Sequence, residues 1–217
     1  MHDADQNLQC PLCLDTDVEK TAFSFKIRHY YFCRNCNLVY ADRLTLPDAK
    51  DEIERYKFHQ NSEKDDGYLT FLEKAITPLL DRISPYDVGL DYGCGPSKTT
   101  SELLARENIL CDVYDPFFYP QIPKTEYDFI ISTEVFEHFH QPYSDIKKMI
   151  SLLKPGGYLG VMTEFWQDMD KFADWYYIRD HTHVCFYHFD TMKYIEKSHS
   201  LKMKYTDGKR VVIFQKL

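Results

Sequence analysis

Short apolar runs alternate with amphipathic stretches along the C-terminal part of the chain. The runs are rich in β-branched and aromatic residues, which is typical of strands buried on both faces. They lie at residues 88–91, 111–114, 127–133 and 158–163, and helical patterns follow the first run and cover 142–153. Because strands and helices alternate, residues 85–217 are predicted to form an α/β domain.

Two further patterns refine this domain. Thr206-Asp207-Gly208-Lys209 is a turn sequence that predicts a hairpin between strands at 201–205 and 211–215. The helix at 142–153 has a proline in its first turn and places five apolar side chains on one face: Tyr143, Ile146, Met149, Ile150 and Leu153. These side chains are expected to face the core.

Residues 47–84 are predicted to be a helical linker. A charged helix is expected at 48–57 and an amphipathic helix at 68–83, with Pro78 expected to kink or split the second. The polar segment 59–68 between them is rich in turn-forming residues. We interpret it either as a solvated linker or as a lid over a ligand site, because the first strand of the α/β domain follows.

Two Cys-x-x-Cys pairs lie in the N-terminal part, residues 1–46. Aromatic and β-branched residues at 22–27 and 30–32 predict a short hairpin that carries the second pair. The spacing lets two tight knuckles meet around one tetrahedral ion, and four thiolates leave no open coordination position. We therefore predict a zinc-ribbon-like module with a structural zinc ion, the alternative being four buried thiols without metal. The predicted ligands are Cys10, Cys13, Cys33 and Cys36.

Composition narrows the classes of function. A chain of 217 residues, 44% of them apolar, can hold one α/β domain and a small appendage. The formal charge of −8 disfavours charge-driven binding to a phosphate backbone or an anionic membrane. No apolar run is long enough to span a bilayer and the first nine residues carry no signal segment, so a cytoplasmic protein is expected.

A glycine turn follows the first strand of the α/β domain. Asp91 ends the strand, Gly93-Cys94-Gly95 forms the turn, and a helix begins after it. Glycine fits where the backbone passes close to a ligand, and the helix start offers free N–H groups to a carboxylate. The next strand ends at Asp115, where an acid suits ribose hydroxyls. Together these features predict a site for a ribose-containing cofactor.

In these motifs the chain resembles the class I S-adenosylmethionine-dependent methyltransferases, over roughly residues 85–217. Besides the glycine turn, residues 127–139 are similar to the family's fourth strand and loop, and 154–163 to its turn into strand five. The resemblance implies a Rossmann-like, mostly parallel sheet of the seven-stranded type, methyltransferase activity and S-adenosylmethionine as cofactor. It assigns to the cofactor Asp91, Gly93, Cys94, Gly95, Asp115, Pro116, Phe117, Thr133 and Glu134.

Two departures from the family pattern change the expectation. Ser97 stands in place of the last glycine of the turn motif, which loosens the packing expected there. The segment Pro116–Tyr127 is too short for the usual helix, third strand and loop, so the strand 3 region is expected to be shortened. The family's acid that reads the adenine amine then has no counterpart, and Phe117 or Phe118 is expected against the adenine ring.

Candidate catalytic residues follow the fourth strand. Methyl transfer to a hydroxyl or amine needs an aligned nucleophile and a group that accepts its proton. Glu134, Glu137 and His138 are spaced so that one helical turn would bring them to one face. His183 lies in the 164–189 insertion, where the family places substrate-covering segments. We predict Glu137, His138 and His183 to be catalytic.

The motif Glu-x-x-Glu-His with a distant histidine also resembles metal-dependent O-methyltransferases, those of small-RNA 3′ ends and those of the ubiquinone pathway. That resemblance implies a divalent ion such as magnesium, which acidifies the acceptor hydroxyl. The alternative is metal-free, with His138 or His183 as general base and Asp180 as its orienting partner. The aromatic run at 165–177 is interpreted as core and lid packing rather than a substrate pocket.

Three functions stay open. An enzyme that methylates an oxygen or nitrogen of a small molecule is favoured. An RNA methyltransferase that binds its substrate through the zinc module is the second, and the charge of −8 speaks against it. A non-catalytic partner protein that binds S-adenosylmethionine is the third, and the intact Asp91, Gly93, Gly95 and Asp115 argue against it. The sequence identifies neither the acceptor nor the oligomeric state.

Overall fold

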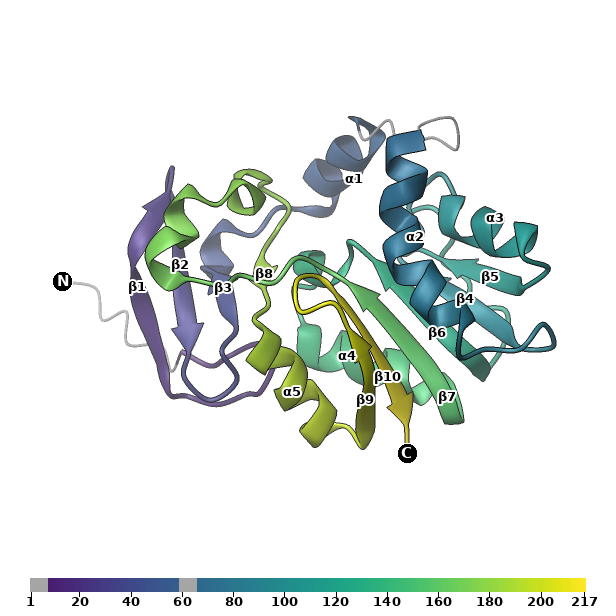
Figure 1. The fold of residues 1–217 in the computed structure, drawn as a ribbon. Coiled ribbons are helices and arrows are strands. Elements are labelled where there is room, and N and C mark those ends of the chain that lie inside the picture. The colour runs from purple at the N-terminus through teal and green to yellow at the C-terminus, as the bar shows by residue number, and fades with distance from the viewer. Residues whose placement is uncertain (1–7, 59–65) are drawn as a thin grey trace.

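The computed structural model describes residues 8–58 and 66–217, which fold around two β-sheets (Figure 1). The linker-or-lid segment expected at 59–68 lies outside the described residues except for its last three, which begin a helix. Within these ranges no helix has the length and apolar character that crossing a bilayer requires.

The larger sheet has six strands in the order β5-β4-β6-β7-β10-β9. The first four in this order are parallel, and β10 and β9 are antiparallel, β10 to β7 and β9 to β10. The strands are β4 (Val88–Tyr92), β5 (Leu110–Tyr114), β6 (Tyr127–Thr133), β7 (Leu153–Met162), β9 (Leu201–Thr206) and β10 (Val211–Lys216). This is the predicted Rossmann-like fold. The region of the third strand contains a single bridge, Asp115 to Tyr119, as its short length led us to expect.

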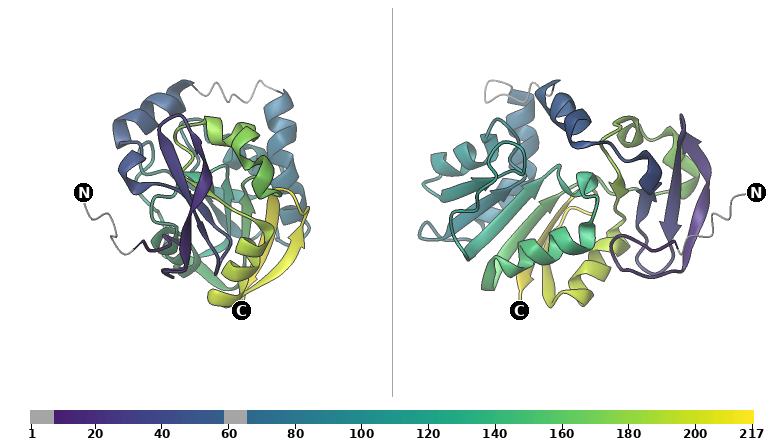
Figure 2. Two further views of the ribbon diagram at one scale, coloured as in Figure 1. Left: turned by 90° about the vertical axis from the view of Figure 1, so that its left-hand side faces the viewer. Right: turned by 180° about the vertical axis from the view of Figure 1, so that it is seen from behind.

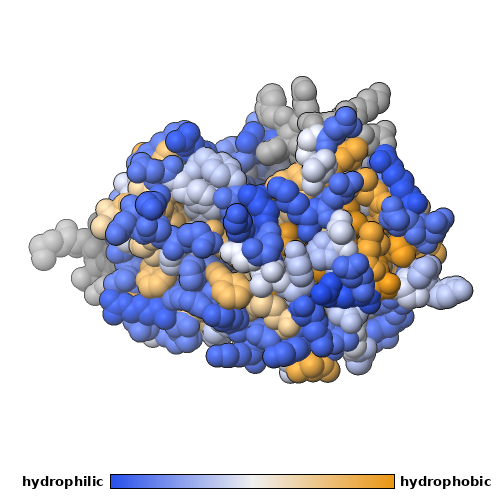
Figure 3. All heavy atoms as spheres, viewed as in Figure 1, coloured by the Kyte–Doolittle hydropathy of each residue, from blue (hydrophilic) through white to orange (hydrophobic). Residues whose placement is uncertain are grey.

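Helices cover both faces of this sheet (Figures 1 and 2). Successive side chains of a strand point to opposite faces, so Phe129 and Ile131 pack with one pair of helices and Ile130 with the other. The first pair is α2 (Asp66–Leu80) and α3 (Thr99–Arg106), and the second is α4 (Pro142–Ser151) and α5 (Phe189–Ser198). The face shown in Figure 3 is mainly hydrophilic, and its apolar side chains gather chiefly along α2.

The structure differs from expectation in two local details. Of the kink or split expected at Pro78, the split is absent, because α2 runs unbroken through Pro78 to Leu80. Pro78 lies in the last turn of α2, where little helix remains to be disrupted, and its carbonyl accepts a hydrogen bond from Arg82 Nη1. Tyr143 was expected to face the core with the other apolar side chains of α4, but it is 37% exposed.

The smaller sheet combines the N-terminal module, described from residue 8 to 46, with a distant part of the chain. Its order is β1-β2-β3-β8, all antiparallel. The strands are β1 (Val18–Phe25), β2 (Arg28–Cys33), β3 (Val39–Ala41) and β8 (Cys185–Phe186). A short 3₁₀ helix, η1 (Arg43–Thr45), and helix α1 (Ala49–Phe58) follow β3 and lead towards α2 (Figure 1).

The 164–189 insertion packs against the N-terminal module through aromatic rings. Phe172 stacks on Phe23 at 4.7 Å between ring centroids and meets the edge of Tyr30 at 6.0 Å. Trp166 lies 6.1 Å from Phe32. Most of the aromatic run is therefore core shared with the module. Besides β8, the insertion holds two 3₁₀ helices, η3 (Met169–Asp174) and η4 (Tyr176–Arg179).

The sheet allows no side chain at Gly89 in β4. A Cβ there would lie 2.0 Å from the ring of Phe129, whereas one at Gly160 in β7 would lie 3.7 Å from its nearest neighbour. We expect Gly89→Ala to lower the free energy of unfolding by about 1–3 kcal/mol, because the Phe129 ring must move. Urea unfolding measures this, with Gly160→Ala as the control that should lose much less. Equal losses would contradict the explanation.

Candidate active site and cysteine cluster

A cavity of about 670 Å³ opens at the carboxyl ends of β4, β5 and β6. The chain connections of the parallel strands diverge between β4 and β6, and ligands of α/β proteins bind at such a point. The volume lies in the range of pockets that enclose small ligands. Parts of α1, α2 and the 164–189 insertion complete the wall.

The glycine turn forms the floor of the cavity. Gly93 and Gly95 have φ values of +86° and +63°, which glycine adopts without strain. The N–H groups of Gly93 and Cys94 donate to the carbonyl of Tyr114, at 2.7 and 3.1 Å. A Cβ at Gly93 would lie 2.5 Å from a methyl group of Val135, and one at Gly95 would meet no atom of the described residues within 4 Å. The backbone therefore lies open to a ligand at Gly95.

Asp91 and Asp115 are both buried beside this turn. Asp91 is 1% exposed, and neither of its carboxylate oxygens has a hydrogen-bond partner in the described part of the chain. Burial, and then the charge of Asp115, raises the pKa of Asp91 to about 8. Asp91 lies beneath the cavity rather than on its wall, because it is absent from the lining that Gly93, Gly95 and Asp115 share.

The carboxylate of Asp115 ties two turns together. One oxygen accepts from the N–H groups of Phe117 (2.8 Å) and Phe118 (3.1 Å), and the other accepts from the N–H of Gly95 (3.1 Å). A carboxylate offers about four lone-pair positions, so one stays available to a ligand. Asp115 thus shapes the site and also reaches into it.

The remaining residues assigned to the cofactor from sequence also line the cavity. They are Cys94, Pro116, Phe117, Thr133 and Glu134. Of the two phenylalanines expected near the adenine ring, Phe117 lines the cavity and Phe118 does not.

The sequence patterns did not predict the part of the wall that comes from α1, α2 and the turn between β9 and β10. Glu52, Arg55 and Tyr56 of α1 line the cavity, as do Tyr68 and Phe71 of α2 and Arg210 of β9–β10. The ring of Tyr56 lies 6.1 Å from Phe117 and 5.3 Å from His138. Among the sequence-based expectations, only the interpretation of residues 59–68 as a lid pointed to this part of the chain as a border of the cavity.

The two glutamates after β6 occupy different backbone conformations. Glu134 has φ +55°, an uncommon value for a side-chain-bearing residue, and its N–H donates to Met162 O at 2.7 Å. The 3₁₀ helix η2 (Phe136–His138) begins after it, so the expected helical turn holds Glu137 and His138 but not Glu134. Burial, and then the charge of Glu137, raises the pKa of Glu134 well above its ordinary value.

Glu137 is fully buried with one oxygen unsatisfied. Oε2 accepts from the hydroxyl of Thr163 at 2.7 Å, and Oε1 has no hydrogen-bond partner among the described residues. Tyr177 donates from its hydroxyl to Glu134 Oε2 at 3.1 Å. A buried carboxylate oxygen without a donor is costly unless a ligand or ion satisfies it.

Both histidines are oriented by backbone carbonyls. His138 Nδ1 lies 3.0 Å from Thr182 O, and His183 Nδ1 lies 2.8 Å from Tyr177 O. A carbonyl only accepts, so Nδ1 carries the proton in each ring, and the neutral ring keeps its lone pair on Nε2. Backbone carbonyls therefore orient the two imidazole rings, the role that we expected of Asp180. The carboxylate of Asp180 accepts from Arg55 at 2.8 Å and from the hydroxyl of Thr182 at 2.7 Å.

The structure brings the three predicted catalytic residues together. One ligand atom from each of Glu137, His138 and His183 lies within 4.8 Å of the others, and the two imidazole rings are 4.9 Å apart. All three line the cavity. Histidines that donate Nδ1–H to a backbone carbonyl and so keep the lone pair on Nε2 are typical of metal sites. This arrangement fits a divalent ion or a proton-accepting pair.

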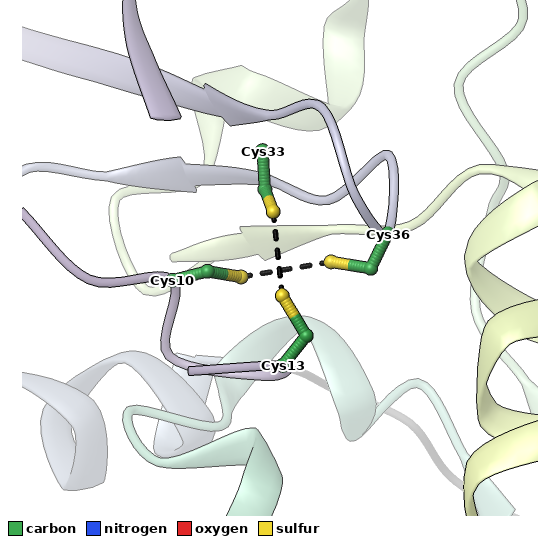
Figure 4. Close-up of side chains that lie close together, drawn as sticks. All are labelled: Cys10, Cys13, Cys33 and Cys36. Atoms are coloured by element: carbon green, nitrogen blue, oxygen red, sulfur yellow. Dashed lines mark hydrogen bonds between the residues drawn. The ribbon is translucent and has the colours of Figure 1, made fainter. Parts of the chain in front are cut away.

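The four predicted zinc ligands form a second cluster (Figure 4), and none of them lines the cavity. The sulfur atoms of Cys10 and Cys36 are 3.6 Å apart and those of Cys13 and Cys33 are 3.4 Å apart. A tetrahedral zinc–thiolate site with bonds of about 2.3 Å separates its sulfurs by about 3.8 Å. All seven cysteines lie in the described ranges and none is in a disulfide. The donor set therefore fits zinc.

Comparison with known proteins agrees with the fold and the cavity. A family described as a methyltransferase domain matches residues 61–198, more than half of the chain. The chain belongs to this family and is a class I S-adenosylmethionine-dependent methyltransferase. No curated protein matches the sequence.

Three solved structures share the fold at 12% identity. One described as a putative methyltransferase from Bacillus halodurans has a TM-score of 0.50, over 68% of this chain and 99% of that one. An O-methyltransferase family protein from Burkholderia thailandensis has 0.54, over 80% and 65%. The 1,6-didemethyltoxoflavin-N1-methyltransferase of the same organism, solved with S-adenosylhomocysteine, has 0.54, over 91% and 99%. At this identity the likeness concerns the fold alone.

Proposed function

We propose that the enzyme methylates a hydroxyl or amine of a small molecule, assisted by a divalent ion held by Glu137, His138 and His183. The observation that carries the proposal is the convergence of these three side chains on the wall of the cavity that contains the glycine turn. The unsatisfied Oε1 of Glu137 and the oriented imidazoles of His138 and His183 form a set of lone-pair donors suited to a metal ion.

The cofactor would lie on the glycine turn, and S-adenosylmethionine supplies a methyl group bonded to a positively charged sulfur. The open backbone at Gly95 and the crowded position of Gly93 support this placement. Asp115 would bind a ribose hydroxyl through its remaining lone pair. The buried carboxylates Asp91 and Glu134 favour a cationic ligand nearby.

Glu137, His138 and His183 would act on the acceptor. A divalent ion bound to them would acidify an acceptor hydroxyl, which is the chemistry such an ion supplies. Two of the three donors are imidazoles, which suit zinc, iron or nickel, and the third is a carboxylate, which suits manganese or magnesium. Thr163 holds Glu137 in place, and the carbonyls of Thr182 and Tyr177 keep each Nε2 as a lone-pair donor.

A small acceptor fits the cavity better than RNA. Aromatic rings from α1, α2 and η4 line the cavity and suit a compact, partly apolar molecule. They are Tyr56, Tyr68, Phe71, Tyr176 and Tyr177. The charge of −8 opposes RNA binding. The toxoflavin methyltransferase among the structural neighbours acts on a small molecule, which supports the same class of acceptor.

We also propose that the cysteine cluster holds a structural zinc ion in a zinc-ribbon-like module. The support is the mutual distance of the four sulfurs and the pair of matching turns that present them. In each turn the residue after the second cysteine has a left-handed backbone and donates to the carbonyl of the first: Leu14 to Cys10 at 3.0 Å and Asn37 to Cys33 at 2.9 Å. The division of the chain at residues 46 and 84 is likewise a proposal.

The metal-assisted reaction can be tested on protein dialysed against a weak chelator until one zinc per chain is left. Mn²⁺ binding is followed by electron paramagnetic resonance, and methyl transfer by labelled S-adenosylmethionine with a panel of hydroxylated and aminated small molecules. We expect transfer to depend on added Mn²⁺, and Glu137→Gln to weaken Mn²⁺ binding about 10–100-fold.

Glu126→Gln is the matched control, because Glu126 is exposed and does not line the cavity. It should bind Mn²⁺ and transfer methyl groups as the native protein does. Full transfer without any added divalent ion, or equal Mn²⁺ binding by native protein and Glu137→Gln, would refute metal assistance.

A further inference from the structure

We propose that Arg28 of the N-terminal module is a positioning residue for His183, so that the module acts as a scaffold for the catalytic site. The inference rests on the proposed role of His183. It gives the module a function in the reaction that does not require it to touch the substrate.

Arg28 is a buried cation that joins two distant segments. It is the first residue of β2 and is 9% exposed. Its Nη1 donates to the carbonyl of His183 at 3.1 Å, and its Nη2 donates to the carbonyl of Thr45 at 2.8 Å. The planar guanidinium fork fixes the distance and direction between two acceptors, which a lysine cannot do. Arg28 therefore connects the backbone of His183 to that of Thr45, in the 3₁₀ helix that follows β3.

The residues after His183 are held from two sides. On one side they pair with β3, Tyr40 opposite Cys185 and Val39 opposite Phe186. On the other side the N–H of Val184 donates to the carbonyl of Glu137 at 2.7 Å. Val184, which directly precedes β8, thus links the sheet of the N-terminal module to the segment that carries Glu137. β8 lies beside β3 at this junction (Figure 1).

The neighbours of His183 in its turn are held by other bonds, since Thr182 donates to Asp180 and Val184 donates to Glu137. For the carbonyl of His183 the structure shows Arg28 as the donor. The N–H of His183 donates to Asp180 O at 3.2 Å, and its side chain depends on the 2.8 Å bond from Nδ1 to Tyr177 O. Without Arg28 the carbonyl of His183 would be left buried and without its donor, so the turn would shift to regain a partner. The ring of His183 would then lose its fixed tautomer and its alignment with Glu137 and His138.

The position of Arg28 also connects the cysteine cluster to the active site. β2 has Arg28 at one end and Cys33 at the other. Tyr30, between them, packs against Phe186 of β8 at 5.8 Å between ring centroids. A strand anchored by the cluster at its far end holds Arg28 more firmly than a free hairpin would.

The imidazole ¹⁵N spectrum tests the inference on the full-length, zinc-loaded protein without an acceptor. The signals of His183 are assigned by their loss in His183→Gln. We expect the native protein to show one tautomer of His183, protonated on Nδ1, and Arg28→Met to show a mixture of both tautomers. Mn²⁺ binding should weaken about tenfold or more in the same variant.

Arg34→Met is the matched control. Arg34 lies in the same module, between the two cysteines of the second pair, and its exposed side chain pairs with Glu19 at 2.5 Å. Its variant should keep the native spectrum of His183. If Arg28→Met does not fold, Arg28→Lys decides, because it keeps the charge and loses the fork; a mixture of tautomers is expected there too.

The inference and the proposed metal site fail in different ways. A native His183 spectrum in folded Arg28→Met, or in Arg28→Lys where the methionine variant does not fold, overturns the inference whatever the metal does. A native protein that binds no Mn²⁺ refutes the metal site, and the tautomer change on replacing Arg28 then still establishes that Arg28 positions His183.

Discussion

The Asp115→Ala variant should bind S-adenosylhomocysteine about 100-fold more weakly than the native protein. Asp115 accepts hydrogen bonds from Gly95, Phe117 and Phe118, and these bonds shape both turns of the proposed cofactor site. A hydrogen bond to a charged group contributes about 1.5–3 kcal/mol, and about 1.4 kcal/mol is a factor of ten in affinity. The variant loses both the hydrogen bond between Asp115 and the ligand and the geometry of the two turns, which together account for the 100-fold loss of affinity. Isothermal titration calorimetry measures this affinity.

Asp112→Ala provides the matched control. Asp112 lies on the same strand, β5, and pairs with Lys124 and Tyr127 at 3.1 and 3.2 Å, but it does not line the cavity. Its variant should bind S-adenosylhomocysteine with native affinity. If the two variants lose affinity equally, general destabilisation of β5 is responsible. If neither does, Asp115 has no part in the cofactor site.

The Cys33→Ser variant should contain no zinc and should unfold at a temperature lower by roughly 10 °C. A module of this size buries too little apolar surface to fold alone, so metal binding is part of its folding free energy. Losing several kcal/mol shifts the unfolding midpoint of a chain of this length by about 2–4 °C per kcal/mol. Elemental analysis gives the zinc content, and calorimetry gives the midpoint.

Cys111→Ser separates loss of zinc from loss of a thiol elsewhere in the fold. Cys111 lies on β5, far in the fold from the cysteine cluster, and is not a predicted ligand. Its variant should keep one zinc ion per chain. A Cys33→Ser protein that keeps its zinc, or that unfolds at the native temperature after losing it, would contradict a structural role for the ion.

Features set by local chemistry could be predicted from the sequence. The glycine turn needs positive φ at Gly93 and Gly95, and the structure has it at both. The short stretch between Asp115 and Tyr127 leaves no room for a strand, and the sheet lacks one there. In these cases the neighbouring residues and the chain length decide the outcome, so pattern and spacing are sufficient.

Features set by contacts between distant segments could not be predicted. Nothing in the composition of α1 indicates that Tyr56 meets Phe117 over the cavity. The two-residue strand β8 is too short to leave a pattern, and its pairing with β3 is decided by tertiary packing. The left-handed backbone at Glu134, which places this residue outside the helical turn, is also a result of its surroundings rather than of its residue type.

The shared sheet has a consequence for how such a protein can be recombined. Because β8 completes the sheet that β1, β2 and β3 begin, the amino-terminal and carboxyl-terminal parts are not independent building blocks. A graft that imports residues 8–46 from another enzyme would leave Cys185 and Phe186 without strand partners. A successful exchange must move the amino-terminal segment and the 164–189 insertion as one unit.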